Sequence, residues 1–238
     1  MLCIVTDAHI DAGTPQADEF LEMLDALSST PHDVLFLGDI MELWFAIWRY
    51  ENDFHRQFVA WCRKEKEKRR IYFIEGNHEF YATSKYRDAF TQGTVNSILL
   101  GEAFFTHGHR IQEPPWGINR WTQALIRSKP IWAGAVIVPF GHAIVDGIKR
   151  MLSSNGKYNK KPFVPTEKIQ AWAEGVIKKN PNIKHLFIGH FHKSETIKLA
   201  NEAECHVLSP WKDTRDISLF NLQSNTLSTQ HWKKLLTD

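Results

Sequence analysis

Short apolar runs alternate with longer amphipathic segments in the first third of the chain. The runs at 2–5, 34–37 and 71–74 have the length and composition of buried strands. Between them, segments 15–27 and 52–68 place apolar residues at helical spacing. Alternating strands and helices favour parallel strand pairing, and in such sheets functional residues gather beyond the carboxyl ends of the strands. This region therefore predicts an α/β sheet.

The pattern changes after residue 96. Two short apolar runs around Gly101-Glu102 predict a hairpin at 97–106, and a helix at 166–178 leads into a further buried strand at 184–188. The C-terminal part predicts antiparallel strands joined by polar turns. Their apolar runs are 196–199, 205–208, 217–220 and 226–232.

Segment 112–165 interrupts this alternation and reads as helical, with apolar residues near one face. We expect a single domain over 1–238 that carries this segment as a helical insertion, or lid. Between residues 114 and 165 it has eight Lys and Arg against one acid, Asp146, together with several tryptophans. A basic, aromatic helix pair suits an anionic lipid or a membrane surface. The alternative is a cap packed on the core with solvated lysines. The candidate substrate-binding residues are Trp116, Arg120, Trp121, Arg127 and Trp132.

The apolar runs end at side chains that can bind a metal ion. The richest example is Gly189-His190-Phe191-His192, where two histidines alternate directly after the run at 184–188. Turns favour Gly, Asn and Asp but have no need for histidine, so turn chemistry alone does not explain the pattern. The candidate ligands are Asp7, His9, Asp39, Asn77, His107, His190 and His192.

Oxygen and nitrogen ligands without thiolates suit Mn, Fe, Zn, Ni or Co. Seven ligands are too many for one ion. Two ions about 3.5–4 Å apart that share a bridging carboxylate would accommodate them and form the clamp used for displacement at phosphorus. We expect two divalent ions, with Mn²⁺ first and Fe, Zn, Ni or Co as alternatives.

The amino-acid composition limits the class of protein but does not indicate a function. The chain has 238 residues, 43% of them hydrophobic, and a formal charge of +2, which hardly distinguishes partners. Its three scattered cysteines do not form a disulfide framework and suit a reducing cytosol. The start lacks the basic region and cleavage site of a signal peptide, and the longest apolar window, 130–145, is interrupted by Pro139 and His142. We expect a cytoplasmic protein with no transmembrane segment.

The ordered motifs D-x-H, G-D, G-N-H-E, a later H and G-H-x-H resemble those of the calcineurin-like metallophosphoesterase superfamily. The resemblance implies a four-layer α/β/β/α sandwich with two mixed sheets. It also implies a first metal held by Asp7, His9, Asp39 and His192. The second metal would be held by Asp39, Asn77, His107 and His190, with Asp39 as the bridge.

The resemblance gives His78 a catalytic role, because the matching histidine contacts the phosphate and helps the leaving group. Glu79 either orients the His78 imidazole or is a solvated charge. His109 faces the same way as His107 if the strand continues, so it is either a donor behind the ligands or the ligand itself; we favour His107 as the ligand.

Within the superfamily the chain resembles the UDP-2,3-diacylglucosamine pyrophosphohydrolases of lipid A synthesis. The shared features are the helical insertion, the acidic-aromatic run from Asp39 to Trp44 and the tryptophan of Ser209-Pro210-Trp211. That family commonly has Arg at the position of His78.

The leading hypothesis is hydrolysis of a phosphoanhydride or phosphodiester in a nucleotide-linked lipid, with peripheral contact at the cytoplasmic face of the inner membrane. The alternatives are a soluble phosphodiesterase or dinucleotide polyphosphatase, and a non-catalytic adaptor with this fold. No nucleic-acid partner is expected, since the basic residues mix with apolar ones.

Overall fold

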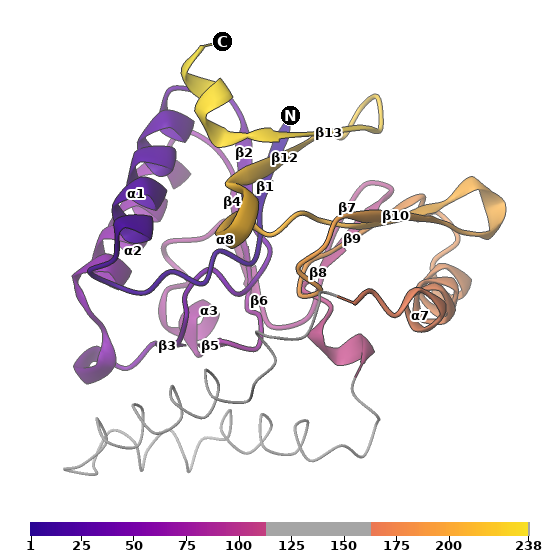
Figure 1. Ribbon diagram of the computed structural model, residues 1–238, viewed down its shortest axis with the longest axis horizontal. Coiled ribbons are helices and arrows are strands. Elements are labelled where there is room, and N and C mark those ends of the chain that lie inside the picture. The colour runs from indigo at the N-terminus through magenta and orange to yellow at the C-terminus, as the bar shows by residue number, and fades with distance from the viewer. Residues whose placement is uncertain (113–162, 238) are drawn as a thin grey trace.

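The computed structural model describes residues 1–112 and 163–237. Two β-sheets lie face to face at its centre, as Figure 1 shows. The first sheet has the strand order β13-β12-β1-β2-β4-β6 and the second the order β10-β11-β9-β8-β7. The first comprises β1 (Leu2–Val5), β2 (Asp33–Phe36), β4 (Ile71–Ile74), β6 (Gln92–Thr94), β12 (Asp216–Asn221) and β13 (Thr226–His231). The second comprises β7 (Ile98–Leu100), β8 (Ala103–Thr106), β9 (His185–Ile188), β10 (Glu195–Lys198) and β11 (Glu204–Val207).

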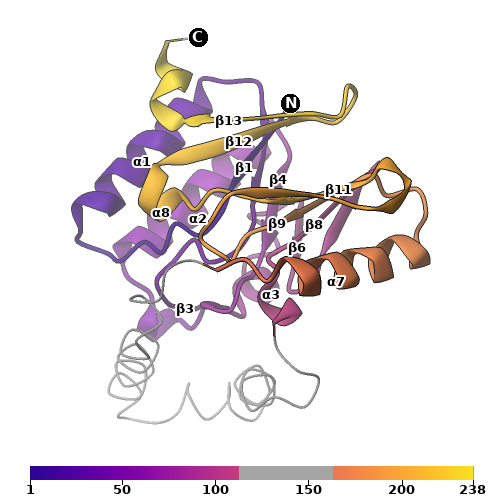
Figure 2. The same cartoon turned by 45° about the vertical axis from the view of Figure 1, so that its right-hand side comes forward.

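Helices cover the outer faces of both sheets. On the first sheet lie α1 (Pro15–Ser28) and α2 (Asp53–Lys66), and on the second lies α7 (Thr166–Lys179), seen beside that sheet in Figure 2. The short elements are β3 (Trp44–Phe45), β5 (Glu79–Phe80), α3 (Ala82–Lys85), α8 (Trp211–Thr214) and the 3₁₀ turns Trp48–Tyr50, His109–Ile111, Ala200–Glu202 and Trp232–Leu236. The predicted four-layer α/β/β/α sandwich is confirmed.

Alternation along the strands creates these layers. In β1, Cys3 and Val5 belong to the apolar cluster under α1 and α2, whereas Leu2 and Ile4 belong to the cluster between the sheets. A third cluster joins the second sheet to α7 through residues such as Ile169. A strand that is apolar on both faces must be covered on both faces, and this is why its sequence reads as a continuous apolar run.

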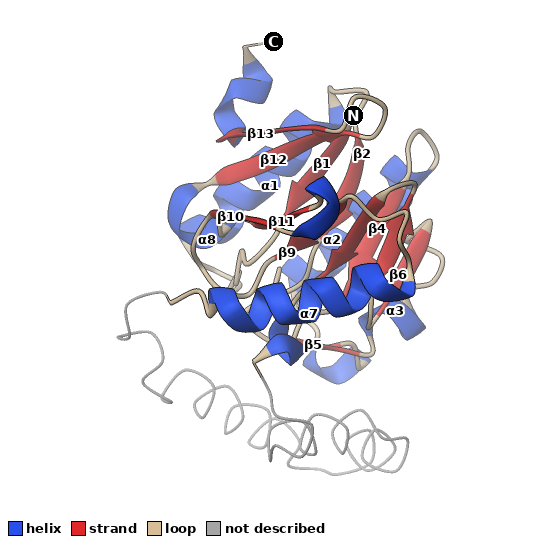
Figure 3. Cartoon of the chain, turned by 90° about the vertical axis from the view of Figure 1, so that its right-hand side faces the viewer, coloured by secondary structure: helices blue, strands red, loops and turns tan. Residues whose placement is uncertain are grey.

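Parallel pairing brings the strand ends of each sheet to one edge. β1, β2, β4 and β6 pair in parallel, as do β8, β9 and β11. Figure 3 shows α7 crossing in front of the second sheet. The carboxyl ends of both parallel groups lie where the candidate ligands follow in the sequence, as the alternation predicts.

The predicted pairing of the C-terminal strands is only partly right. The strands exist, but β10 and β11 join the second sheet, whereas β12 and β13 extend the first. In addition, β11 is parallel to β9 rather than antiparallel. The apolar runs alone do not say with which sheet each strand pairs.

Most of the predicted insertion at 112–165 lies outside the described residues. So do all five candidate substrate-binding residues, Trp116, Arg120, Trp121, Arg127 and Trp132. Within the described ranges, none of the helices combines the length and the apolar character needed to cross a membrane.

Candidate metal centre

The loops that follow β1 and β2 run side by side. The Asp7 amide donates to the Gly38 carbonyl at 3.1 Å, and the His9 amide donates to the Asp39 carbonyl at 2.9 Å. Five candidate ligands, in these two loops and in the loop after β9, have a left-handed backbone with φ between 46° and 70°. They are Asp7, His9, Asp39, His190 and His192. Such conformations cost free energy in residues other than glycine and persist where surrounding contacts fix them, as in many functional sites.

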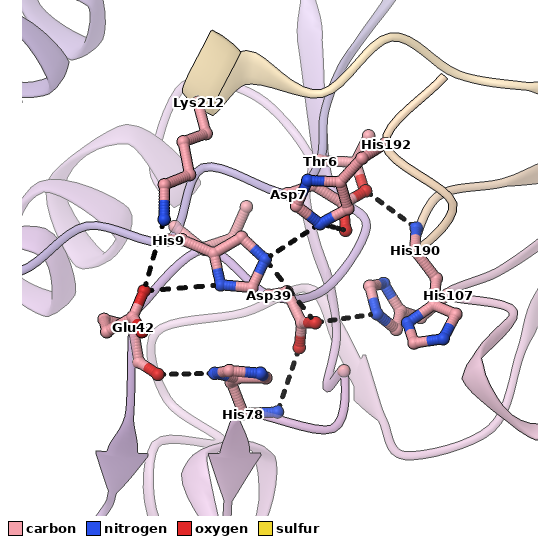
Figure 4. Close-up of polar contacts among 12 residues, drawn as sticks. Thr6, Asp7, His9, Asp39, Glu42, His78, His107, His190, His192 and Lys212 are labelled. Carbon is pink, nitrogen blue, oxygen red and sulfur yellow. Dashed lines mark hydrogen bonds and ion pairs between the residues drawn. The ribbon is translucent and has the colours of Figure 1, made fainter. Parts of the chain in front are cut away.

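The structure brings six of the seven candidate ligands into two adjacent groups at this edge, drawn in Figure 4. One group of ligand atoms comes from Asp7, His9 and His192, and a second from Asp39, His107 and His190; within each group the atoms lie within 4.8 Å of one another. A third group combines His9, Asp39 and His78. The first two groups agree with the ligand sets that the family resemblance implies. The seventh candidate, Asn77, directly precedes His78 in the chain.

Asp39 lies between the two halves. Its Oδ2 is 3.8 Å from His9 Nε2 and 3.1 Å from His107 Nε2, while its Oδ1 accepts the His78 amide at 2.9 Å. Burial raises the pKa of the Asp39 carboxyl, but the charges of His107 and His78 outweigh this, so that its pKa lies well below the ordinary value. Asp39 is therefore an anion placed to bridge two cations.

Several buried polar atoms at this edge have no hydrogen-bond partner. They include Asp7 Oδ1 and Asn77 Oδ1. A buried polar atom without a partner costs roughly 1–3 kcal/mol, so native proteins rarely leave one unsatisfied. Each of these atoms belongs to the predicted ligand set, and metal coordination would satisfy them. The residues present therefore fit a pair of divalent ions.

Hydrogen bonds behind the ligands fix their orientation. The His107 Nδ1–H donates to the Leu37 carbonyl at 2.9 Å, which leaves Nε2 facing Asp39. Asp7 Oδ2 accepts from the Thr6 hydroxyl at 2.7 Å and from the His190 amide at 2.8 Å. The bond between Asp7 and His190 ties the loop of the first sheet to the loop of the second.

Glu79 holds the Asp39 loop. Its carboxylate is fully buried and accepts the amides of Asp39 at 2.9 Å, Ile40 at 2.6 Å and Gly76 at 2.7 Å. Burial and the Asp39 charge raise the pKa of Glu79 to about 7. The prediction that Glu79 is a solvated charge is wrong. Its alternative role, orientation of the His78 imidazole, is better described as support of the Asp39 backbone.

His109 does not continue the strand, contrary to one premise of the sequence reading. The chain turns at Gly108, where φ is 99°, and His109 begins a 3₁₀ turn. Its buried ring nonetheless lies beside those of His107 and His190, with centroids 5.5 and 6.2 Å away, and both ring nitrogens are unpartnered. His107, whose Nε2 faces Asp39, is the better placed ligand; His109 stands behind it.

Glu42, Lys212 and Asp213 were not among the predicted site residues. Glu42 Oε2 lies 3.6 Å from both His9 Nδ1 and Lys212 Nζ. The Lys212 amide also donates to the Asp7 carbonyl at 3.0 Å, which anchors α8 beside the centre. Asp213 Oδ2 lies 3.8 Å from His192 Nδ1. Neither Lys212 nor Asp213 follows a strand end or belongs to a metal-ligand pattern, so no sequence signal marked them.

Comparisons with known proteins complete the description. A search of curated proteins gave no significant match. Among solved structures, the chain is similar to TT1561 of Thermus thermophilus, with 12% identity, a TM-score of 0.46 and coverage of 97% of this chain and 98% of that one. It is similar to Vacuolar Protein Sorting 29 from Cryptosporidium parvum, with 11% identity, a TM-score of 0.44 and coverage of 96% and 94%. It is also similar to a dimetal phosphatase from Danio rerio, with 11% identity, a TM-score of 0.43 and coverage of 97% and 91%.

The family comparison is decisive because it covers most of the chain. The model of the calcineurin-like phosphoesterases matches residues 2–194, a span that contains all seven candidate ligands. The ordered motifs, the sandwich and the clustered ligands agree with that match. The chain thus belongs to the calcineurin-like phosphoesterase family, and this membership supports a hydrolase acting on phosphoester bonds.

Proposed function

We propose that this chain is a dinuclear-metal hydrolase of phosphodiester or phosphoanhydride bonds. The observation that supports this most strongly is the position of Asp39 Oδ2, which faces His9 of one ligand group and His107 of the other. A carboxylate shared in this way favours a pair of ions over a single one. Two divalent ions held there would lower the pKa of water and would stabilise the charge that develops on the phosphoryl oxygens.

His78 is the residue placed to protonate the leaving group. Its Nδ1 hydrogen-bonds the Glu42 carbonyl, which fixes the ring and leaves Nε2 available. Burial lowers the pKa of His78, but the Asp39 charge and the Glu42 carbonyl outweigh this and raise the pKa above its ordinary value. An imidazole in this position beside the ligand cluster is suited to donate a proton to a departing oxygen.

For the substrate we propose a nucleotide-linked lipid such as UDP-2,3-diacylglucosamine, with Mn²⁺ in the centre and peripheral contact with an anionic membrane on the cytoplasmic side. The support is compositional: residues 114–165 carry eight Lys and Arg against one acid, with tryptophans among them. Basic, tryptophan-bearing helices suit anionic lipid surfaces. The G-N-H motif with His78 favours the competing candidate, a soluble diester or dinucleotide polyphosphate.

A substrate panel separates these candidates. Purified protein with Mn²⁺ is assayed on UDP-2,3-diacylglucosamine, on a dinucleotide polyphosphate and on bis-p-nitrophenyl phosphate. We expect the highest kcat/KM on the lipid-linked substrate. A higher value on either soluble class would overturn the lipid proposal while leaving the hydrolase intact. Inactivity on every substrate in protein that also retains no metal would favour the adaptor.

The His78 variant tests the mechanism. His78→Gln removes the acid but none of the seven candidate ligands, so we expect both ions to remain bound and kcat to fall by roughly 10²-fold or more. Metal content by mass spectrometry is measured beside the rate. Loss of both ions from His78→Gln would contradict the assigned role.

A further inference from the structure

A second cluster of metal-ligand side chains lies at the opposite end of the second sheet. It consists of His185 at the start of β9 and of Glu204 and His206 on β11. β9 and β11 are parallel neighbours, and their register places Glu204 directly across from His185. His206 follows Glu204 by two residues and therefore projects from the same face. The dinuclear centre lies beyond the carboxyl ends of these strands, whereas this cluster lies at their amino ends.

The spacing of the three ligand atoms suits a tetrahedral ion. His185 Nδ1 lies 3.3 Å from His206 Nε2, which lies 3.6 Å from Glu204 Oε2. All three atoms are within 4.8 Å of one another. Two nitrogens bound to one tetrahedral Zn²⁺ at the usual bond length are about 3.3 Å apart, so the imidazole pair already has the required separation.

The surroundings orient and shield the imidazoles. The other ring nitrogen of His206, Nδ1, is 3.2 Å from the Thr196 hydroxyl, which turns Nε2 toward His185. The His206 ring packs on Phe187 and the His185 ring on Phe220. An apolar wall behind the ligands and a hydrogen bond to the distal ring nitrogen are recurrent features of histidine metal sites.

The cluster is accessible to a cation from solvent. His185 Nδ1 and His206 Nε2 form a hydrogen bond with each other, so one of them carries a proton that metal binding would release. The Glu204 side chain is 35% exposed and provides a path from solvent. Two imidazoles and one carboxylate form a ligand set suited to Zn²⁺ and its neighbours.

We propose that His185, Glu204 and His206 form a third divalent-metal site, which takes a transition ion such as Zn²⁺ with water as the fourth ligand. The bound ion links β9 to β11 at their amino ends. β9 delivers His190 and His192 at its other end, so the site holds the strand on which the dinuclear centre depends. This inference does not rest on the proposed substrate.

The test counts metal ions per chain. Wild-type holoenzyme, Glu204→Gln and His206→Gln are dialysed against a buffer that contains Mn²⁺ and Zn²⁺, and total bound metal is measured by mass spectrometry. Because Mn and Zn are summed, exchange at the dinuclear centre does not alter the count. His32→Gln, a histidine outside every ligand group, is the matched control. We expect each cluster variant to hold one ion fewer than wild type and the control to hold the same number.

Two further measurements guard against misfolding and misassignment. Without metal, Glu204→Gln should melt at the wild-type temperature, whereas Zn²⁺ added to Mn²⁺-loaded protein should raise the melting temperature of wild type more than that of Glu204→Gln, in which only exchange at the dinuclear centre remains. Asp39→Asn, which disrupts the dinuclear centre, should retain the extra ion. Equal metal counts in wild type and both cluster variants would overturn the proposal, as would loss of the extra ion from Asp39→Asn.

Discussion

The two sheets contribute different halves of the metal centre. Loops of the first sheet supply the oxygen ligands and one imidazole, from Asp7, His9, Asp39 and Asn77. Loops of the second sheet supply imidazoles alone, from His107, His190 and His192. The first half therefore brings the negative charge that attracts cations, and the second brings imidazole nitrogens that complete the coordination.

The halves also differ in how firmly they are held. The Asp39 loop is bound through its amides to the buried Glu79 carboxylate. In the second half, His107 is fixed through Leu37, but the His192 side chain remains 26% exposed. The difference indicates that the first sheet sets the position of the ions and the second adapts to them. A change at Asp39 in the first half should therefore cost both ions, and a change to one ligand of the second half only one.

The largest effect is expected from Asp39→Asn. The change removes the shared anion, so both ions should be lost and kcat/KM should fall on the order of 10³-fold or more, since several kcal/mol of charge stabilisation disappear. Metal content and diesterase rate are measured together. Asp213→Asn, a carboxylate 60% exposed and 3.8 Å from His192, is the control and should change the rate by less than about twofold. Retention of both ions in Asp39→Asn would contradict the claim that the first half sets the position of both ions.

His107→Gln tests the second half. It removes one neutral ligand and leaves the group of Asp7, His9 and His192 complete, so we expect one ion to remain and the rate to fall by roughly 10²-fold. The same assays on His109→Gln sharpen the assignment. If His109→Gln loses the ion and His107→Gln keeps it, the two histidines have been assigned in the wrong order.

Glu79→Gln probes the support of the first half. The amide offers fewer acceptor lone pairs to the Asp39 loop and places an NH₂ group among backbone donors, so unfolding free energy should fall by about 1–3 kcal/mol and metal affinity should drop. Thermal unfolding and metal titration are the measurements. Glu75→Gln is matched, because Glu75 is equally buried but accepts from Thr83. It should lose stability while keeping the metal affinity; equal metal loss in both would show that Glu79 has no special role.

A further change tests the contact between the two halves. A Cβ at Gly189 would meet Thr6 Oγ1 and lie 2.5 Å from Asp7 Oδ2, so Gly189→Ala should destabilise the protein by about 1–3 kcal/mol and weaken metal binding. Gly175→Ala in α7 meets nothing within 4 Å and should instead stabilise by about 0.5–1 kcal/mol through helix propensity. Denaturant unfolding compares the two. If Gly189→Ala leaves the free energy of unfolding unchanged, the two loops can move apart without loss of stability.

The sequence predicted the strand ends well because burial on both faces leaves an uninterrupted apolar run. β4 has the predicted bounds, 71–74, and α2 begins after Asn52, whose side chain accepts the His55 amide. β6 was missed, since Gln92, Gly93 and Thr94 carry no apolar pattern and are placed by pairing with β4. Pairing of this kind depends on residues distant in sequence, which a local pattern does not contain.

In the candidate site, too, the sequence predicted the local features but not those that depend on folding. Residue types at strand ends were sufficient to propose the seven ligands, but not the support that Glu79 gives, because that support depends on amides brought together by folding. Trp44 and Trp211 had entered the resemblance to lipid-cleaving enzymes. Both are fully buried, Trp44 stacked on His55 and Trp211 against Phe20. These tryptophans are core residues, so their presence carries no information about the substrate.

The pairing of β1 has a consequence for biosynthesis. β1 lies between β2 and β12, with Leu2 opposite Phe220, so one edge of β1 stays unpaired until β12 has been made. An apolar strand with a free edge is prone to non-native association. During translation, the loop that carries Asp7 and His9 thus follows a strand whose sheet is still incomplete. Metal capture by the complete ligand set is likewise a late event, because His190 and His192 are made after the other five candidate ligands.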